Sequence, residues 1–458
     1  MISYKELHIQ GLQDYDLLHK ELEILRPNAN HLHLIKELKC RIGLKCKKIV
    51  IEQPYRDADF SSVHTLFYSK KHFYVERDCI RLLFLADEEL ESIFGVISVR
   101  DSTTDSRGRA AFKPKYLLQV NKAFILQSPH KLNLFGEEFK TNSFPWMAQD
   151  TDVDVCAHIA VWSVVNYYSQ KRANYASKTI GKIVEQTPNS LGRKTPSTGL
   201  NLQQISDILQ ENGFYPLIIS RDQLGQQMFS QALYSYVESG IPVIAALTKK
   251  AHAIVVTGHE AANLDRLSQH TGIITPDELI SNWIVSDDNH LPFQAVGTKG
   301  RYQQQDIDYL VVPLAEKMYL NANTVVERVK NLLHSNTLSI PKNSVLRVYL
   351  TSSKALKRVA SKNYAENKRL TYVTLSLPMP QFVWCADIAS YEEYKNGLTS
   401  ARIIIDSTAG TYEAEPWLLI HDKNELKYLD EKRNTYLEST KIKPYKLYTN
   451  NLIEVDKL

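Results

Sequence analysis

A cysteine at the start of an apolar run is the first residue of this sequence with the means for covalent chemistry. Cys156 follows a polar, acidic turn that contains Gln149, and the apolar residues between 159 and 167 recur at the spacing of a buried helix. We therefore expect Cys156 at the N-terminus of a helix, where free backbone N–H groups and the helix dipole favour a nucleophilic thiolate. The alternative is a small core residue, because a cysteine in an apolar helix often serves only for packing.

A histidine and an aspartate further along the chain supply the other groups that a nucleophilic cysteine needs. Residues 240–247 and 252–259 are predicted to form two buried strands, and His252 begins the second of them. A third short apolar strand, 283–286, ends directly at Asp287. A thiol, an imidazole that acts as its base and a carboxylate that fixes the imidazole tautomer are the groups used for acyl transfer by cysteine.

Two further polar residues, Asp288 and Asn289, follow Asp287 directly and compete for the role of orienting His252. Neighbouring residues on an extended strand point to opposite faces, so only one of Asp287 and Asp288 is expected to face the histidine. Asp287 stands at the end of the strand, where the backbone ladder fixes it best, and we predict it as the orienting acid. Asn289 is an alternative.

Other histidines, cysteines and arginines are predicted to be structural. His158 lies two residues after Cys156, and positions i and i+2 of a helix point to nearly opposite faces. Cys385 lies in an apolar run without a histidine near it in sequence, which favours a buried thiol. The polar loop 100–109 carries three arginines, and we expect a solvated hairpin tip there and assign it no site.

Together these features resemble the papain-like cysteine peptidases, in particular the bacteriocin-processing, double-glycine branch. The resemblance spans residues 144–313 and rests on one segment and four residues: 196–214, Gln149, Cys156, His252 in His-Ala-Ile-Val-Val-Thr-Gly, and Asp287. It implies an α+β core in which a helix carrying the cysteine packs on an antiparallel sheet carrying the histidine and the aspartate. It also implies that Gln149 and the backbone N–H of Cys156 stabilise the oxyanion, and that no cofactor or metal takes part.

The predicted function is thiol-dependent acyl transfer, most simply hydrolysis of a peptide or isopeptide bond. Cys156 attacks the carbonyl carbon, His252 takes the thiol proton and returns it to the leaving amine, and Asp287 orients the imidazole. A transglutaminase or deamidase would use the same triad.

A non-catalytic interaction protein on a degenerate papain-like core is the alternative from another class. Two features of the sequence favour it. Ala157 stands where the family usually has glycine, and Gln149 lies seven residues before the cysteine instead of the usual six.

Composition sets the broad class of protein. The 458 residues are 43% hydrophobic and 23% charged, as in a soluble globular chain with room for two or three domains. A net charge of +4, from 55 basic and 51 acidic residues, gives no reason to expect nucleic acid as a partner. Five cysteines without a Cys-x-x-Cys pair argue against a disulfide framework and a structural zinc site. Without an apolar leader or a stretch of about 18 apolar residues, we expect a cytoplasmic protein with no membrane span.

An α+β architecture is expected along the whole chain, in three parts. These are an N-terminal α+β module (1–140), a papain-like domain (141–320) and a C-terminal α+β module (321–458). Because a small peptidase does not need such long flanks, we predict that they hold a protein or peptide substrate or partner. Strands are expected in the flanks at 48–52, 81–85, 93–99, 345–350, 372–377 and 402–406, and helices at 57–68, 324–333 and 354–368.

Overall fold

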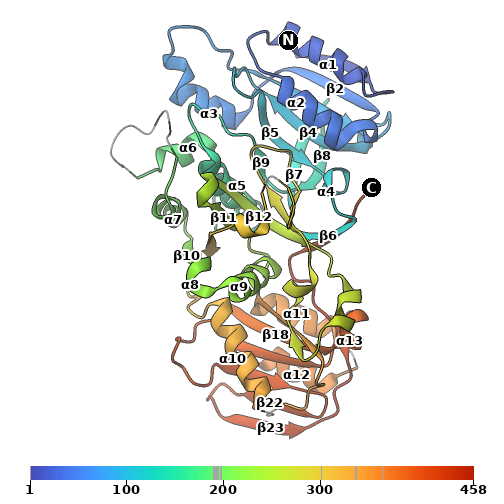
Figure 1. Ribbon diagram of the computed structural model, residues 1–458, viewed down its shortest axis with the longest axis vertical. Helices are drawn as coiled ribbons and strands as arrows, with labels where there is room; N and C mark the ends of the chain where they lie inside the picture. Colours follow the sequence, from blue (N-terminus) through green and yellow to red (C-terminus); the bar gives the residue numbers. More distant parts are fainter. Residues whose placement is uncertain are drawn as a thin grey trace.

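Three large sheets, formed from the apolar runs of the sequence, organise the structure. The computed structural model describes residues 2–188, 195, 197, 199–300, 302–335, 338–364 and 366–458, and is a mixed α+β fold with mainly antiparallel sheets. The N-terminal part lies at one end of the long axis, the C-terminal part at the other and the middle of the chain between them (Figure 1). Of the segment 196–214, Pro196 and Thr198 lie outside the described residues.

The N-terminal sheet confirms the strands and the helix expected in the first flank. Its strands are β1 (Ser3–His8), β2 (Lys48–Tyr55), β3 (Cys79–Leu85), β4 (Ile93–Val99), β5 (Arg107–Phe112) and β9 (Trp146–Met147). They pair antiparallel in the order β1-β2-β3-β4-β5-β9. Every residue of β3 and β4 is buried, as their largely apolar sequences predict, and the buried Arg81 of β3 pairs with Glu52 of β2.

The helices of this part are α1 (Asp14–Leu25), α2 (Leu32–Glu37) and α3 (Ala58–Leu66). α1 and α2 bury Leu18, Leu22 and Leu34 in the same core as the sheet. α3 begins where Asp57 accepts the backbone N–H of Phe60 at 2.9 Å, a standard N-terminal cap.

The middle sheet carries the strands on which the predicted site depends. Its strands are β10 (Tyr215–Ser220), β16 (Tyr309–Leu314), β11 (Val243–Leu247), β12 (His252–Glu260), β14 (Trp283–Ser286) and β15 (Gln294–Val296), paired antiparallel in that order. Its main helices are α5 (Cys156–Lys171), α7 (Leu202–Glu211) and α9 (Gln226–Glu238). α5 packs against β12, and its residues from Ala157 to Tyr168 are all buried and mostly apolar.

The C-terminal sheet is antiparallel except at one edge. Its strands are β13 (Ile273–Ile274), β17 (Ser344–Ser352), β18 (Phe382–Ser390), β20 (Ala401–Asp406), β21 (Trp417–His421), β22 (Glu425–Leu429) and β23 (Thr435–Ser439). Only β13 runs parallel to its neighbour, β17. The helices are α10 (Ala322–His334), α11 (Ser353–Asn363), α12 (Lys368–Ser376) and α13 (Tyr391–Lys395).

The strand expected at 372–377 is wrong, because most of this segment belongs to α12. Leu370, Val373 and Leu377 are buried, and their spacing of three and four residues is that of a helix face. The same short segment also alternates apolar and polar residues, so its sequence fits both periods.

Shorter elements complete the fold. They are α4 (Pro114–Leu117), α6 (Ile180–Glu185), α8 (Arg221–Leu224), the hairpin of β7 (Ser128–Leu134) and β8 (Glu137–Ser143), the pair β19 (Leu398–Thr399) and β24 (Tyr445–Lys446), and the strands β6 (Lys122–Ile125) and β25 (Ile453–Asp456).

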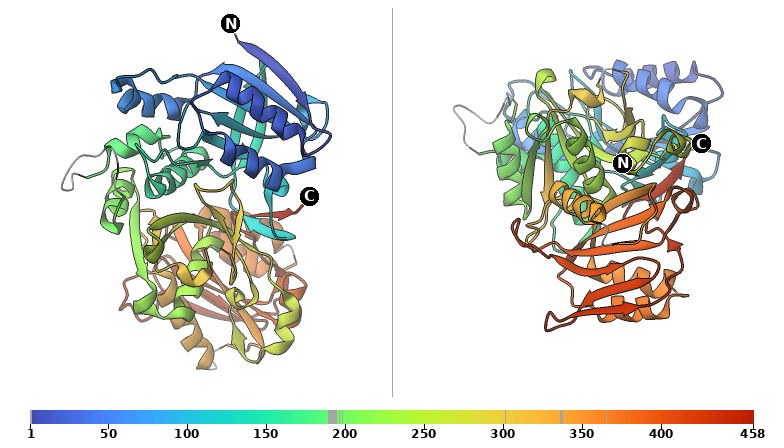
Figure 2. Two further views of the ribbon diagram at one scale, coloured as in Figure 1. Left: turned by 45° about the horizontal axis from the view of Figure 1, so that its top comes forward. Right: turned by 60° about the horizontal axis from the view of Figure 1, so that its bottom comes forward.

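Several strands lie in a sheet other than the one their place in the sequence suggests. β6 pairs with β12 of the middle sheet, and β25 pairs with β6. β13 belongs to the C-terminal sheet although it precedes residue 320. The end of the chain consequently returns to the middle of the molecule, near β6 (Figures 1 and 2).

A buried charge network links the middle and C-terminal sheets. Glu238, the last residue of α9, accepts a hydrogen bond from Arg347 of β17 at 2.8 Å, and one of its carboxylate oxygens lies 2.8 Å from Nε2 of His259 on β12. Arg347 also donates to the Tyr448 carbonyl at 2.7 Å. The side chains of Glu238, His259 and Arg347 are all more than nine-tenths buried, so these contacts replace the hydrogen bonds to water that burial removes.

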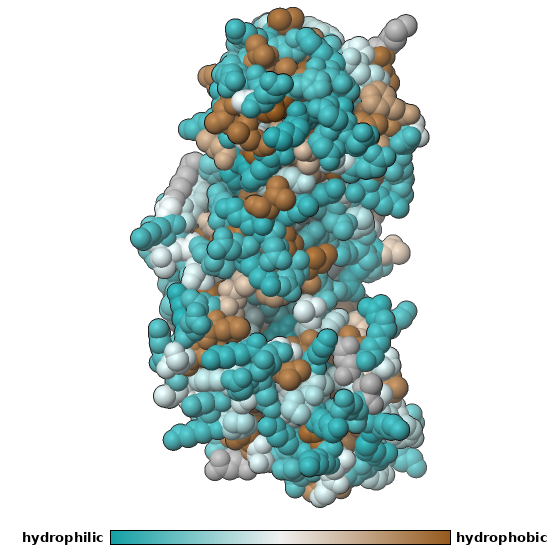
Figure 3. Space-filling view, turned by 90° about the vertical axis from the view of Figure 1, so that its right-hand side faces the viewer, coloured by the Kyte–Doolittle hydropathy of each residue, from teal (hydrophilic) through white to brown (hydrophobic). Residues whose placement is uncertain are grey.

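The surface is hydrophilic where Figure 3 shows it, and hydrophobic residues form small, separated groups on that face. Every helix in the described part of the chain falls short of the length and apolar character that crossing a bilayer requires. The apolar runs of the sequence instead lie in the buried hydrophobic cores between the sheets and their helices.

Candidate active site

Cys156 is the first residue of α5, as its position before an apolar run predicts. The turn before it is held by the carboxylate of Asp154, which accepts the backbone N–H of Asp150 at 2.6 Å. His158 points elsewhere, since its Nε2 lies 2.9 Å from the Thr187 hydroxyl. The helix therefore presents the thiol, and not the neighbouring imidazole, toward β12.

His252 and Asp287 lie side by side at the ends of β12 and β14. The two strands pair antiparallel with Val255 opposite Ser286, which brings the start of one to the end of the other. Nε2 of His252 lies 2.9 Å from Oδ1 of Asp287. The Tyr302 ring stacks on the His252 imidazole with a centroid distance of 4.9 Å. The imidazole is therefore positioned by this stacking as well as by its hydrogen bond to Asp287.

The backbone around Asp287 is fixed from two sides. Its carbonyl accepts the indole N–H of Trp146 at 2.7 Å, and its carboxylate accepts the backbone N–H of Asn289 at 3.0 Å. Trp146 lies on β9, so the N-terminal sheet helps to place the acid. Such a carboxylate can hold one imidazole tautomer, with the proton on Nε2.

Asp288 and Asn289 also approach the histidine. Oδ1 of Asp288 lies 3.7 Å from Nε2 of His252, and the Asn289 amide nitrogen lies 3.4 Å from it. The expectation that only one of the two aspartates faces the histidine is thus wrong. The reason is that β14 ends at Ser286 and the chain turns at once, so the alternation of a strand no longer applies.

No hydrogen bond joins Cys156 and His252 within the part of the chain that the structure describes. Over the same residues, Nδ1 of His252 has no hydrogen-bond partner, because Nε2 makes the contacts with the carboxylates. The thiol is close to the same strand, since the backbone N–H of Ala253, the next residue along, interacts with it. Nδ1 is therefore the nitrogen available to take a proton.

The pKa of the Cys156 thiol is shifted in the direction opposite to the one that the sequence predicts. Burial raises the pKa of Cys156 to about 12, and the nearby carboxylates of Asp288 and Asp287 act in the same direction. The backbone N–H groups of Ala253 and Ala157 favour the thiolate but do not outweigh burial. The resting form is a thiol, so the thiolate expected from the helix N-terminus alone is wrong.

The pKa values of the two aspartates shift in opposite directions. Burial opposes ionisation of Asp287, but the hydrogen bond and charge of His252 prevail and lower its pKa below the usual range. Burial and the charge of Asp287 raise the pKa of Asp288 well above its usual range. Both carboxyl oxygens of Asp288 lack a hydrogen-bond partner among the described residues. Ionisation is accordingly disfavoured at Asp288 and favoured at Asp287.

Gln149 is half-buried, and the described structure shows no hydrogen bond from its side chain. Its backbone carbonyl accepts a hydrogen bond from Arg100 at 2.5 Å. This contact fixes the backbone before Cys156, but the predicted oxyanion role of the side chain stays a prediction.

The loop 100–109 is where the sequence expectation failed most clearly. Arg100 and Arg107 are each only 1% exposed, so they do not belong to a solvated hairpin tip. Arg100 holds the Gln149 carbonyl, and Arg107 donates to the Asn289 carbonyl at 3.2 Å. These two arginines support the segments before Cys156 and after Asp287. No local signal in the sequence identifies them, because their partners lie far along the chain.

Alkylation of Cys156 by iodoacetamide is expected to be slow at neutral pH. Because its pKa is raised to about 12, the rate should keep rising with pH beyond about 8.5, where an ordinary thiol is already half ionised. Peptide mass spectrometry of samples taken at a series of pH values measures this rate, with the exposed Cys40 as an internal comparison. Labelling of Cys156 as fast as that of Cys40 at neutral pH would contradict the raised pKa.

The arrangement joins a buried thiol, an imidazole with one nitrogen unpaired, and an ionised carboxylate on the other nitrogen. These groups can carry acyl transfer, and His252, Asp287 and Asp288 also place three possible metal-ligand atoms within 4.8 Å of one another. The chain matches no known family model, and the comparisons found no matching curated protein and no matching solved structure.

Proposed function

We propose that the protein catalyses thiol-dependent acyl transfer on a papain-like core, most simply hydrolysis of a peptide or isopeptide bond. The observation that carries the proposal is the 2.9 Å contact between Nε2 of His252 and Asp287, which leaves Nδ1 unpaired on the strand against which the helix of Cys156 packs. A base oriented through one nitrogen and free at the other is what a cysteine nucleophile requires.

The proposed reaction runs in two steps. Nδ1 of His252 takes the Cys156 proton as the sulfur attacks the carbonyl carbon, and the imidazolium then gives this proton to the leaving amine. Water, deprotonated by the same imidazole, hydrolyses the thioester and regenerates the thiol. Because the pKa of the thiol is about 12, proton removal accompanies the attack instead of preceding it.

Stabilisation of the oxyanion is assigned to the backbone N–H of Cys156, at the free end of α5, together with the Gln149 side chain. With a glutamine side chain as acyl donor, the same site would be a deamidase if water resolves the thioester and a transglutaminase if an amine does. The proposal includes a protein or peptide substrate and a cytoplasmic location, in line with five free cysteines.

A non-catalytic interaction protein is the second candidate. The specific observation that favours it is the thiol itself, because burial and the nearby Asp288 carboxyl group raise its pKa to about 12. In this case the core would serve as a scaffold for the flanking sheets.

Trapping of a thioester distinguishes the two candidates. The full-length protein is mixed with a p-nitrophenyl ester of a short peptide, quenched with acid and analysed by intact mass and peptide mapping. The enzyme is expected to give an acyl adduct on Cys156 that forms and then decays with turnover, and Cys156→Ala should give none. Cys40→Ala is the matched control, because Cys40 is an exposed cysteine outside the site. An adduct that never decays, or equal turnover by Cys156→Ala, would favour the scaffold.

A further inference from the structure

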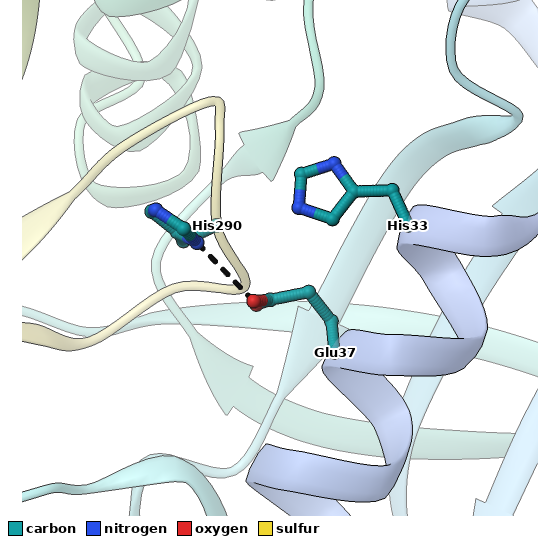
Figure 4. A group of neighbouring side chains, drawn as sticks. All are labelled: His33, Glu37 and His290. Carbon is teal, nitrogen blue, oxygen red and sulfur yellow. Dashed lines mark hydrogen bonds and ion pairs between the residues drawn. The ribbon is translucent and has the colours of Figure 1, made fainter.

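A second cluster of titratable side chains lies where the N-terminal helices meet the loop that follows β14. His33 and Glu37 are one helical turn apart on α2, and His290 comes from the loop (Figure 4). One ligand atom from each residue lies within 4.8 Å of the others. Nδ1 of His290 lies 3.2 Å from Oε1 of Glu37, so two of the three groups already meet.

Neighbouring groups orient these side chains. Oε2 of Glu37 accepts the backbone N–H of Leu291 at 3.0 Å, which leaves Oε1 facing His290. Nδ1 of His33 lies 3.6 Å from a carboxylate oxygen of Asp105 and 3.0 Å from a guanidinium nitrogen of Arg107. A guanidinium only donates, so Nδ1 accepts from Arg107 in this structure. Binding of an ion through Nε2 requires the proton to move to Nδ1, which would then donate to Asp105 instead, as in the carboxylate–histidine–metal arrangement of many proteins.

We propose that His33, Glu37 and His290 form a binding site for a divalent transition-metal ion of the Zn²⁺ type. Two imidazole nitrogens and one carboxylate oxygen are a ligand set that Zn²⁺ prefers, and three protein ligands leave a position for water. The side chains of His33, Glu37 and His290 are 38%, 12% and 29% exposed, so an ion can enter from solvent. Arg107 lies close, but Asp105 pairs with it at 2.6 Å and balances its charge.

The site would tie the N-terminal helices to the loop of the proposed triad. His290 follows Asp287, Asp288 and Asn289 directly, and all four belong to one short segment after β14. Arg107 bonds both His33 and the Asn289 carbonyl, so the two clusters already share a support. The metal site goes beyond the proposed acyl transfer, and neither depends on the other.

Direct metal binding tests the site without reference to any activity. The metal-stripped full-length protein is titrated with Zn²⁺ by calorimetry, and with Co²⁺ while its visible absorption is recorded. We expect one ion per chain, Co²⁺ bands that report nitrogen and oxygen ligands, and loss of both in His33→Ala and in His290→Ala. Asp105→Asn should weaken Zn²⁺ binding by about 10–100-fold, as removal of a group that orients a ligand does. His72→Ala, at an exposed histidine outside the cluster, should bind like the wild type.

Three outcomes would overturn the proposal. One is a wild-type protein that binds neither ion, and another is undiminished binding by both histidine variants. The third is binding that survives in His33→Ala but disappears in Asp288→Asn, which would assign the ion to His252, Asp287 and Asp288. His33 is partly exposed, so its replacement is expected to leave the fold intact, and circular dichroism of each metal-free variant checks this.

Discussion

Replacing His252 with alanine is expected to lower the rate of thioester formation at Cys156 by about 10²–10⁴-fold. The thiol has a pKa of about 12 and cannot supply enough thiolate at neutral pH without a base. Single-turnover mixing with the p-nitrophenyl peptide ester, followed by mass spectrometry of the acyl adduct, measures the rate. His72→Ala is the matched histidine control. A His252→Ala protein that acylates at the wild-type rate would remove the imidazole from the mechanism.

The same assay identifies which carboxyl group orients His252. Asp287→Ala should also cause a severe loss, because the contact at 2.9 Å fixes the tautomer and stabilises the imidazolium. Asp288→Asn should matter much less, since burial raises the pKa of Asp288 well above its usual range and an amide has nearly the same shape as a carboxyl group. The reverse order of effects would identify Asp288 as the orienting acid, and mild losses in both variants would point to Asn289.

The largest effect on stability is expected from Glu238→Ala, which should lower the free energy of unfolding by about 3–5 kcal/mol. Removing this carboxylate leaves the buried Arg347 guanidinium without its closest partner and His259 without its hydrogen bond to α9. Urea unfolding followed by circular dichroism measures the change. Glu316→Ala, at an exposed glutamate, is the control and should stay within about 0.5 kcal/mol of the wild type.

A second variant tests the physical reason for this loss. Glu238→Gln keeps hydrogen-bonding atoms in place but removes the negative charge. It should still be clearly less stable than the wild type, because Arg347 loses its nearest counter-charge and keeps only the more distant Asp387, at 3.6 Å. Equal stability of Glu238→Ala and the wild type would mean that the network does not hold the middle and C-terminal sheets together.

Local patterns in the sequence were sufficient for most strands and for the position of the cysteine. The apolar runs of β3, β4 and β12 are short, which favours buried strands over helices, and Cys156 could be placed at the start of α5 by the apolar period that follows it. The segment 372–377 failed because six residues satisfy a strand period and a helix period equally well.

The parts of the site that the sequence could not predict depend on distant partners. The burial of Arg107 follows from the Asn289 carbonyl, a contact between residues 182 positions apart. The proximity of Asp288 to His252 follows from a turn whose direction is not encoded in strand alternation. The raised pKa of Cys156 likewise follows from burial beneath other segments, which no local motif reports.

The pairing of β25 with β6 has a consequence for the order in which the molecule can assemble. β6 is made early in synthesis, whereas β25 is made only after the whole C-terminal sheet. Until then one edge of β6 exposes unpaired backbone groups, the kind of edge to which strands of other chains add. The middle sheet is therefore expected to be completed only once Ile453–Asp456 has left the ribosome, and a nascent chain halted before that point should be prone to association with its neighbours.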